Sequence, residues 1–163
     1  MFHDLCPYSE QEPNHLALWE MLIYRDIKAF TQKNWKMVEQ DFISNEFQGI
    51  HANFSLDPSQ WKLAFPSIES YRDEWLKQAK ESFNKTYSRP LDESLLELSY
   101  LDKIEINGSR ACVRKCFNGV LQTKAGKETL KWQTIYFCKK KCFWQISGFV
   151  GYLAFDQPLT LTS

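Results

Sequence analysis

The spacing of apolar residues divides the chain into two parts. Over residues 14–85 the apolar residues recur mostly at helical intervals, and over 95–155 they follow mostly the pattern of strands. No internal repeat, low-complexity tract or linker lies between the two parts. We therefore expect a single α+β domain over residues 1–163, with a core at about 14–155 and terminal extensions at 1–13 and 156–163.

The first part of the chain predicts three helices. Pro13 and Asn14 are typical of a helix start, and the first helix continues to about Gln32. A short second helix follows with Asn34 as its cap, and Ser67 begins the third. The expected inner faces of the three helices are Leu16, Trp19, Ile23, Ile27 and Phe30; Trp35, Val38, Phe42 and Ile43; and Ile68, Tyr71, Trp75, Ala79 and Phe83.

The remaining predicted elements are extended. Residues 45–52 form a brief extended segment, and a loop follows between Pro58 and Pro66. Asn107-Gly108 is a strong hairpin signal, because both residues tolerate the positive φ of a two-residue turn. The four long strands are expected at 95–106, 110–122, 128–139 and 142–155, although residues 93–98 also fit a helical turn. Short turns join these strands into an antiparallel meander, whose apolar face the three helices must cover.

Both faces of this sheet are partly apolar. In the third strand Trp132, Thr134, Tyr136 and Cys138 share one face. In the fourth, Trp144, Ile146, Val150 and Tyr152 face one way, and Phe143, Phe149 and Leu153 face the other. A sheet covered by helices on one side and apolar on the other commonly meets a second copy of itself, so we expect a homodimer formed through the sheet.

Composition narrows the class of protein. The 163 residues are 44% hydrophobic and 15% aromatic, which is typical of a folded chain with an aromatic core. Lysines and arginines number 20, as do acidic residues, so no global field favours a nucleic acid or an anionic membrane. The sequence has neither a secretory leader nor an apolar run near the ~20 residues of a membrane helix. We expect a cytoplasmic protein.

Four of the cysteines are candidate metal ligands, but their spacing disfavours a metal site. Cys112-x3-Cys116 and Cys138-x3-Cys142 supply four thiols, the number that a structural zinc ion binds. Residues four apart in a strand are ~13 Å from each other, whereas zinc needs each sulfur within ~2.3 Å. With Cys6 the cysteine count is odd, which fits reduced, buried thiols better than disulfides. We expect no metal and no cofactor.

The order of predicted elements and several short motifs resemble a known superfamily. The segments are Tyr24–Phe30, Asn34–Val38, Asp41-Phe42, Phe47–Gly49 and Trp144–Phe149. They are similar to the opening and the last strand of the polyketide-cyclase-like (SnoaL-like) members of the nuclear transport factor 2-like superfamily. The resemblance spans about 14–155. It implies a cystatin-like, cone-shaped α+β barrel with three N-terminal helices on the concave face of a curved antiparallel sheet.

The resemblance to this superfamily does not assign a reaction to the chain. The superfamily includes isomerases, dehydratases, cyclases, transport adaptors and proteins of unknown role, so fold alone assigns no activity. Its ketosteroid isomerases use a Tyr on the first helix and an acidic base after the second. Those positions correspond to Asp26 and Ile50 here, with His51 beside the second. Because Ile cannot abstract a proton, that mechanism is not inherited.

Two residues are nevertheless candidates for acid–base chemistry. Asp26 lies beside the buried stripe of the first helix, where desolvation would turn its carboxylate into a base; a structural pairing with Arg114 or another cation is the favoured alternative. His51 is a candidate base or hydrogen-bond donor, against the favoured alternative of a histidine satisfied at a strand edge. The candidate ligand-binding residues are Trp19, Tyr24, Phe47, Tyr71, Trp75, Tyr100, Arg114, Trp132 and Tyr136.

Two hypotheses of function follow. In the first, an apolar cavity under the helices binds a small, largely apolar molecule, with lyase or isomerase chemistry as the reaction that needs the fewest groups. In the second, aromatic side chains fill the interior, and the protein is a non-catalytic accessory subunit that acts through its exposed sheet. An open cavity with Asp26 and His51 pointing into it would favour the first hypothesis, and a plugged one would contradict it.

Overall fold

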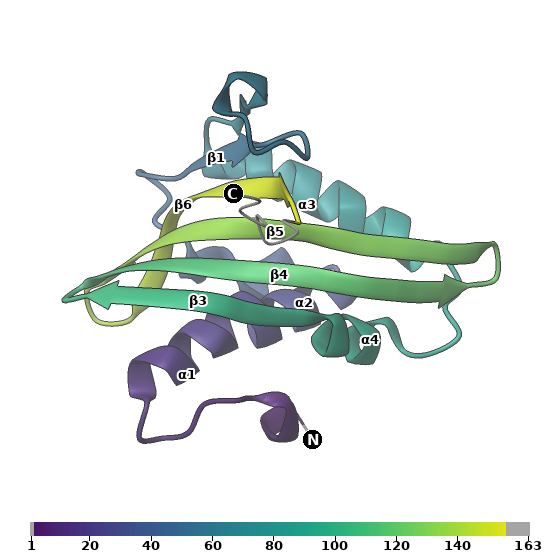
Figure 1. Cartoon of the computed structure of the whole chain (residues 1–163), viewed down its shortest axis with the longest axis horizontal. Helices are drawn as coiled ribbons and strands as arrows, with labels where there is room; N and C mark the ends of the chain where they lie inside the picture. The colour runs from purple at the N-terminus through teal and green to yellow at the C-terminus, as the bar shows by residue number, and fades with distance from the viewer. Residues whose placement is uncertain (1, 156–163) are drawn as a thin grey trace, which may run out of the picture.

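A computed structural model of the chain describes residues 2–155 (Figure 1). The predicted extension at 156–163 lies outside the described residues. The first long helix comprises α1 (Pro13–Trp19), a π-helical turn η2 (Glu20–Arg25) and α2 (Asp26–Thr31). It follows the predicted course closely, because its apolar stripe continues through all three segments. No helix of the described chain has the length and apolar character to cross a membrane.

The third predicted helix is α3 (Ile68–Phe83), and its start is as expected. Ser67 accepts a hydrogen bond from the Ser70 backbone N–H at 3.3 Å, and the Ser70 hydroxyl completes the reciprocal capping box. The short second helix is instead two 3₁₀ turns, η3 (Trp35–Met37) and η4 (Glu39–Asp41), and Asn34 makes no side-chain cap. A fourth short helix, α4 (Leu91–Leu98), occupies the segment where strand and helical turn were both possible.

The sheet has six strands in the order β2-β1-β6-β5-β4-β3. The predicted meander is confirmed as β3 (Ser99–Asn107), β4 (Arg110–Thr123), β5 (Gly126–Lys140) and β6 (Trp144–Ala154). The first turn is Gly108-Ser109, one residue later than predicted: Asn107 pairs with Arg110, and of the turn residues only Gly108 has a positive φ, of 61°. The strand β1 (Gln48–His51) pairs with β6 in parallel, and β2 (Lys62–Phe65) lies where a loop was predicted. The sheet is therefore mixed and open, and α2 and α3 lie behind it in Figure 1.

The predicted faces of Phe149 and Val150 in β6 were wrong, whereas Tyr152 and Leu153 lie on the faces predicted for them. Trp144, Ile146 and Phe149 pack in the interior, whereas Val150 and Leu153 form a separate cluster with Ala52. Two register shifts against β5 explain this, one between Phe137 and Cys138 and one between Gln133 and Ile135. Each shift adds one residue of β6 relative to β5 and moves the side chains that follow to the opposite face, so the second shift reverses the first after Val150.

Aromatic rings fill one end of the concave face. This packed end, as we call it below, lies between the start of α3, the turns η3 and η4, and the strand β1. Tyr71 and Phe149 have ring centroids 5.0 Å apart, and Trp35 stacks on Phe42 at 5.2 Å. The buried rings of the packed end are Trp35, Phe42, Phe47, Phe65 and Phe149. The expected aromatic core is thus present, but it occupies only part of the interior.

Candidate functional site

A cavity of about 430 Å³ occupies the other end of the concave face. Its walls come from α2, from α3 between Tyr71 and Ser82, from α4, and from β4, β5 and β6. We call this region the hollow end. Close approach of α4 to β4 depends on Gly119, because a Cβ there would lie 2.0 Å from the Leu98 side chain. Aromatic and aliphatic groups supply much of the lining, including Phe30, Trp75, Phe117, Leu121, Leu130 and Trp132.

A buried ion pair lies at the inner end of the cavity. Lys115 Nζ lies 3.0 Å from Asp26 Oδ2 and donates a second hydrogen bond to the Leu22 carbonyl oxygen at 2.6 Å. Trp75 Nε1 donates to the other carboxylate oxygen of Asp26 at 3.3 Å. The Lys115 side chain is 2% exposed and that of Asp26 is 29% exposed. Lys115 is thus held as a counter-ion, while Asp26 presents part of its carboxylate to the cavity.

Three hydroxyl groups line the same cavity without a protein partner. Within the described residues, the side-chain hydroxyls of Tyr71, Thr134 and Tyr136 make no hydrogen bond, although Thr134 and Tyr136 are each only 9% exposed. Burial raises the pKa of Tyr136 well above its ordinary value, and the charge of Asp26 adds to this effect. The hydroxyl of Tyr136 therefore stays protonated at neutral pH and can donate a hydrogen bond into the cavity.

Tyr152 closes one side of the cavity. Its hydroxyl exchanges hydrogen bonds with the Gln78 side chain at 3.1 and 3.3 Å, which ties the end of β6 to α3. Its φ of 54° is in the left-handed region, which costs a non-glycine residue about 1 kcal/mol or more. His51 stacks on the Tyr152 ring at 4.3 Å, outside the residues that line the cavity.

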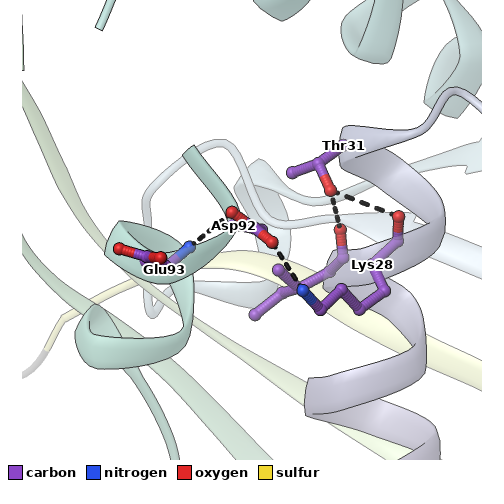
Figure 2. Close-up of polar contacts among 5 residues, drawn as sticks. Lys28, Thr31, Asp92 and Glu93 are labelled. Atoms are coloured by element: carbon purple, nitrogen blue, oxygen red, sulfur yellow. Dashed lines mark hydrogen bonds and ion pairs between the residues drawn. The ribbon is translucent and has the colours of Figure 1, made fainter. Parts of the chain in front are cut away.

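A second hollow of about 390 Å³ adjoins the cavity near the start of α4. The two share the lining residues Phe30, Ser82, Lys85, Tyr87 and Leu91. An ion pair between Lys28 Nζ and Asp92 Oδ2, 2.5 Å apart, joins α2 to α4 at its edge (Figure 2). Asp92 also accepts the Glu93 backbone N–H at 2.9 Å. The hydrogen bond from Lys28 lowers the pKa of Asp92, so the pair is charged at neutral pH.

The structure brings together about half of the residues proposed from the sequence. Asp26, Tyr71, Trp75, Trp132 and Tyr136 all line the cavity. The other six lie elsewhere. Trp19 and Tyr24 belong to a cluster beside α4, Phe47 is part of the packed end, and His51 lies behind Tyr152. Tyr100 is 40% exposed, and Arg114 lies 3.5 Å from Asp102 rather than from Asp26.

Lys115 was not among the site residues predicted from the sequence. The sequence indicated Arg114 or another cation as a possible partner of Asp26, and the partner is the next residue along the strand. A signal was present, because Ala111, Val113, Lys115 and Phe117 alternate on one face of β4. A lysine in the middle of an apolar alternation points toward the interior, where it needs a carboxylate. Thr134 shared its predicted face with Trp132 and Tyr136 but was not proposed as a ligand contact.

The cysteines do not gather into a metal site within the described chain, where no group of three or more His, Cys, Asp or Glu side chains could hold an ion. All five are free thiols. Cys116 and Cys138 are each 2% exposed, and burial raises the pKa of Cys138 to about 12. These two thiols act as small apolar core residues.

Comparison with solved structures identifies the fold. A conserved protein from Planctomyces limnophilus superposes with a TM-score of 0.58, covering 87% of this chain and 96% of its own, at 13% identity. An NTF2-like protein of unknown function from Shewanella baltica gives 0.53, covering 88% and 95%, at 12% identity. The chain has the nuclear transport factor 2-like fold. An NTF2-like superfamily protein from Salmonella enterica gives 0.52, covering 86% and 87%, at 15% identity.

The fold expected from the sequence resemblance is thus confirmed, and the likeness extends no further than the fold. No protein-family model and no curated protein sequence matches the chain. At identities of 12 to 15%, the likeness to these structures assigns no reaction. Any function must be argued from the cavity itself.

Proposed function

We propose that this protein binds a small, largely apolar molecule in the cavity of the hollow end. The observation that carries the proposal is a set of hydroxyls, those of Tyr71, Thr134 and Tyr136, that face the cavity without a partner among the described residues, beside the Asp26–Lys115 pair, in a space lined mainly by rings and aliphatic groups. Buried polar groups in proteins nearly always have a hydrogen-bond partner. A ligand hydroxyl or carbonyl group at the inner end would supply one.

If the ligand reacts, Asp26 is the group placed to accept its proton. Lys115 and Trp75 orient the carboxylate, and Tyr136 can donate a hydrogen bond to an oxygen that gains charge. Lyase or isomerase chemistry by proton transfer needs no further group. The pairing of Asp26 with His51 that the sequence suggested is not part of this proposal, because His51 does not line the cavity.

The proposal is tested by thermal shift and calorimetry with 2-naphthol, 2-acetylnaphthalene and naphthalene. Binding stabilises the folded state by mass action, so the oxygen-bearing compounds should raise the melting temperature more than naphthalene does. Tyr136→Phe should weaken 2-naphthol binding about three- to tenfold, which corresponds to one hydrogen bond, and leave naphthalene unchanged. Tyr100→Phe, on an exposed tyrosine of β3, is the matched control.

A cavity-filling variant provides the stricter test. Leu130→Trp places a large ring into the hollow, whereas Leu63→Trp makes the same change at a residue that is 53% exposed. Leu130→Trp should abolish binding and Leu63→Trp should retain it. Absence of binding by all three compounds to the wild type, or undiminished binding to Leu130→Trp, would contradict the proposal.

We also propose that two copies of the chain pair through the outer face of the sheet. This face carries exposed apolar side chains, with Phe137 45%, Val120 49% and Tyr100 40% exposed. Such side chains along neighbouring strands favour association with a second sheet. Phe137→Glu should convert a dimer to a monomer in light scattering after size-exclusion chromatography, and a monomeric wild type would contradict the proposal.

A further inference from the structure

The side chains that line the cavity carry a net negative charge. They include four carboxylates, of Asp26, Glu74, Glu81 and Glu128, and two ammonium groups, of Lys85 and Lys115, which gives a net formal charge of −2. The whole chain has a net formal charge of zero, so the negative charge is a local property of this site. Clefts lined by one sign of charge raise the local concentration of ligands of the opposite sign.

Two of the carboxylates have no cationic partner. Asp26 pairs with Lys115 at 3.0 Å, and Glu128 pairs with Lys85 at 3.0 Å. Within the described residues, Glu74 and Glu81 make no ion pair; Glu74 accepts a hydrogen bond from the neutral Gln78 side chain at 3.1 Å. The two glutamates are seven positions apart on α3, which puts them on the same helix face, ~10 Å apart. Both carboxylates, which make no ion pair among the described residues, therefore border the cavity along one wall.

The inner end of the cavity requires a different kind of group. Tyr136 and Thr134 are nine-tenths buried and need a hydrogen-bond partner, but Lys115 already neutralises Asp26. An anionic group there would be a third charge without a counter-ion, and burying an unpaired charge is strongly unfavourable. A hydroxyl or a carbonyl satisfies the hydroxyls without adding charge.

We infer that the cavity selects amphiphilic amines: apolar ring compounds with a neutral hydroxyl or carbonyl group at the inner end and a protonated amine beside Glu74 and Glu81. The inference rests on the proposed binding function and specifies its ligand class. The aromatic rings of Trp75, Trp132 and Tyr152 line the space between the two ends, and rings of this kind also attract a cation that passes over them. Organic anions of the same shape are excluded by the two free carboxylates.

Three phenols of nearly equal shape test the inference. Tyramine carries an ammonium group, 4-ethylphenol carries none, and 3-(4-hydroxyphenyl)propionate carries a carboxylate. Calorimetry on the full chain at pH 7 and low salt should give tyramine the highest affinity, about three- to tenfold above 4-ethylphenol, with the propionate weakest. Added salt should reduce the preference for tyramine, because it screens exposed charges.

Paired variants locate the source of the preference. Glu74→Gln with Glu81→Gln should bring tyramine to the affinity of 4-ethylphenol, and the affinity of 4-ethylphenol should not change. Glu39→Gln with Glu69→Gln removes the same charge from exposed residues that do not line the cavity, and it should keep the preference for tyramine.

The outcomes separate this inference from the proposal beneath it. If 4-ethylphenol or the propionate binds as tightly as tyramine, the selection of amines is wrong while the binding function stands. The same holds if the preference for tyramine survives in Glu74→Gln with Glu81→Gln. If none of the three phenols binds, both the inference and the binding function are overturned.

Discussion

The packed end and the hollow end of the concave face are built from the same three elements, yet only one is filled. Tyr71, Tyr136 and Phe149, from α3, β5 and β6, lie where the two ends meet: they contact the rings of the packed end and also line the cavity. The chain before and after β1 adds Phe42, Phe47 and Phe65 from a further layer. At the hollow end β6 stops at Ala154, while the β4–β5 hairpin continues beyond it. The cavity therefore lies where the β4–β5 hairpin extends past the end of β6 and no further layer of rings fills the concave face.

The largest effect is expected from removing a ring of the packed end. Phe47 is 2% exposed and contacts the rings of Phe42, Tyr71 and Phe149 at centroid distances of 5.5, 5.4 and 5.7 Å. Phe47→Ala should lower the free energy of unfolding by about 3–5 kcal/mol in urea titrations. Phe117→Ala, at the partly open wall of the cavity, should lower it by less than half as much. Equal losses would contradict the distinction between the two ends.

The two partners of the Asp26–Lys115 ion pair should differ in how much stability the protein loses when each is replaced. Asp26→Asn leaves the Lys115 ammonium, 2% exposed, without a counter-ion and should destabilise by about 3 kcal/mol. Lys115→Met leaves the partly exposed Asp26 carboxylate, which water in the cavity can solvate, and should destabilise by about half as much. Thermal and urea unfolding of both variants will measure the two losses of stability. The double variant Asp26→Leu with Lys115→Met should recover much of the loss, and additive losses would argue against a coupled pair.

The smallest effect concerns the ion pair at the edge of the second hollow. Because Lys28 lowers the pKa of Asp92 in the folded state, the stabilisation is present above the ordinary aspartate pKa of about 4 and is lost as the pH falls through the lower folded value. At pH 6, Asp92→Asn should be less stable than the wild type by about 0.5–1 kcal/mol. The difference should vanish at pH 2, as urea titrations at both values will show.

The matched control for this pair is Asp73→Asn. Its partner is the neighbouring Arg72, and its side chain is 69% exposed. It should have no measurable effect at either pH. A constant difference between the wild type and Asp92→Asn from pH 6 to pH 2 would show that Asp92 acts through packing instead of its charge.

Local sequence signals predicted the elements where neighbours in the chain decide the structure. Ser67 begins α3 because its cap bonds to a residue three positions away, and the chain turns at Gly108 because glycine readily adopts the positive φ found there. The strand β2 was missed because Lys62–Phe65 is too short to show a strand pattern of its own. It is extended because it pairs with β1. The wrong faces in β6 have the same origin, since register shifts arise between strands.

The sequence by itself determined the class of fold, the order of the long elements, the aromatic character of the core and the candidate Asp26, because these depend on periodicity and composition. Only the tertiary structure decided that Lys115 is the partner of Asp26, that His51 lies outside the cavity, and that Glu74 and Glu81 border it without cations. The physical reason is distance. Residues 26 and 115 are 89 positions apart, and whether their charges come into contact depends on how the first long helix packs against the curved sheet.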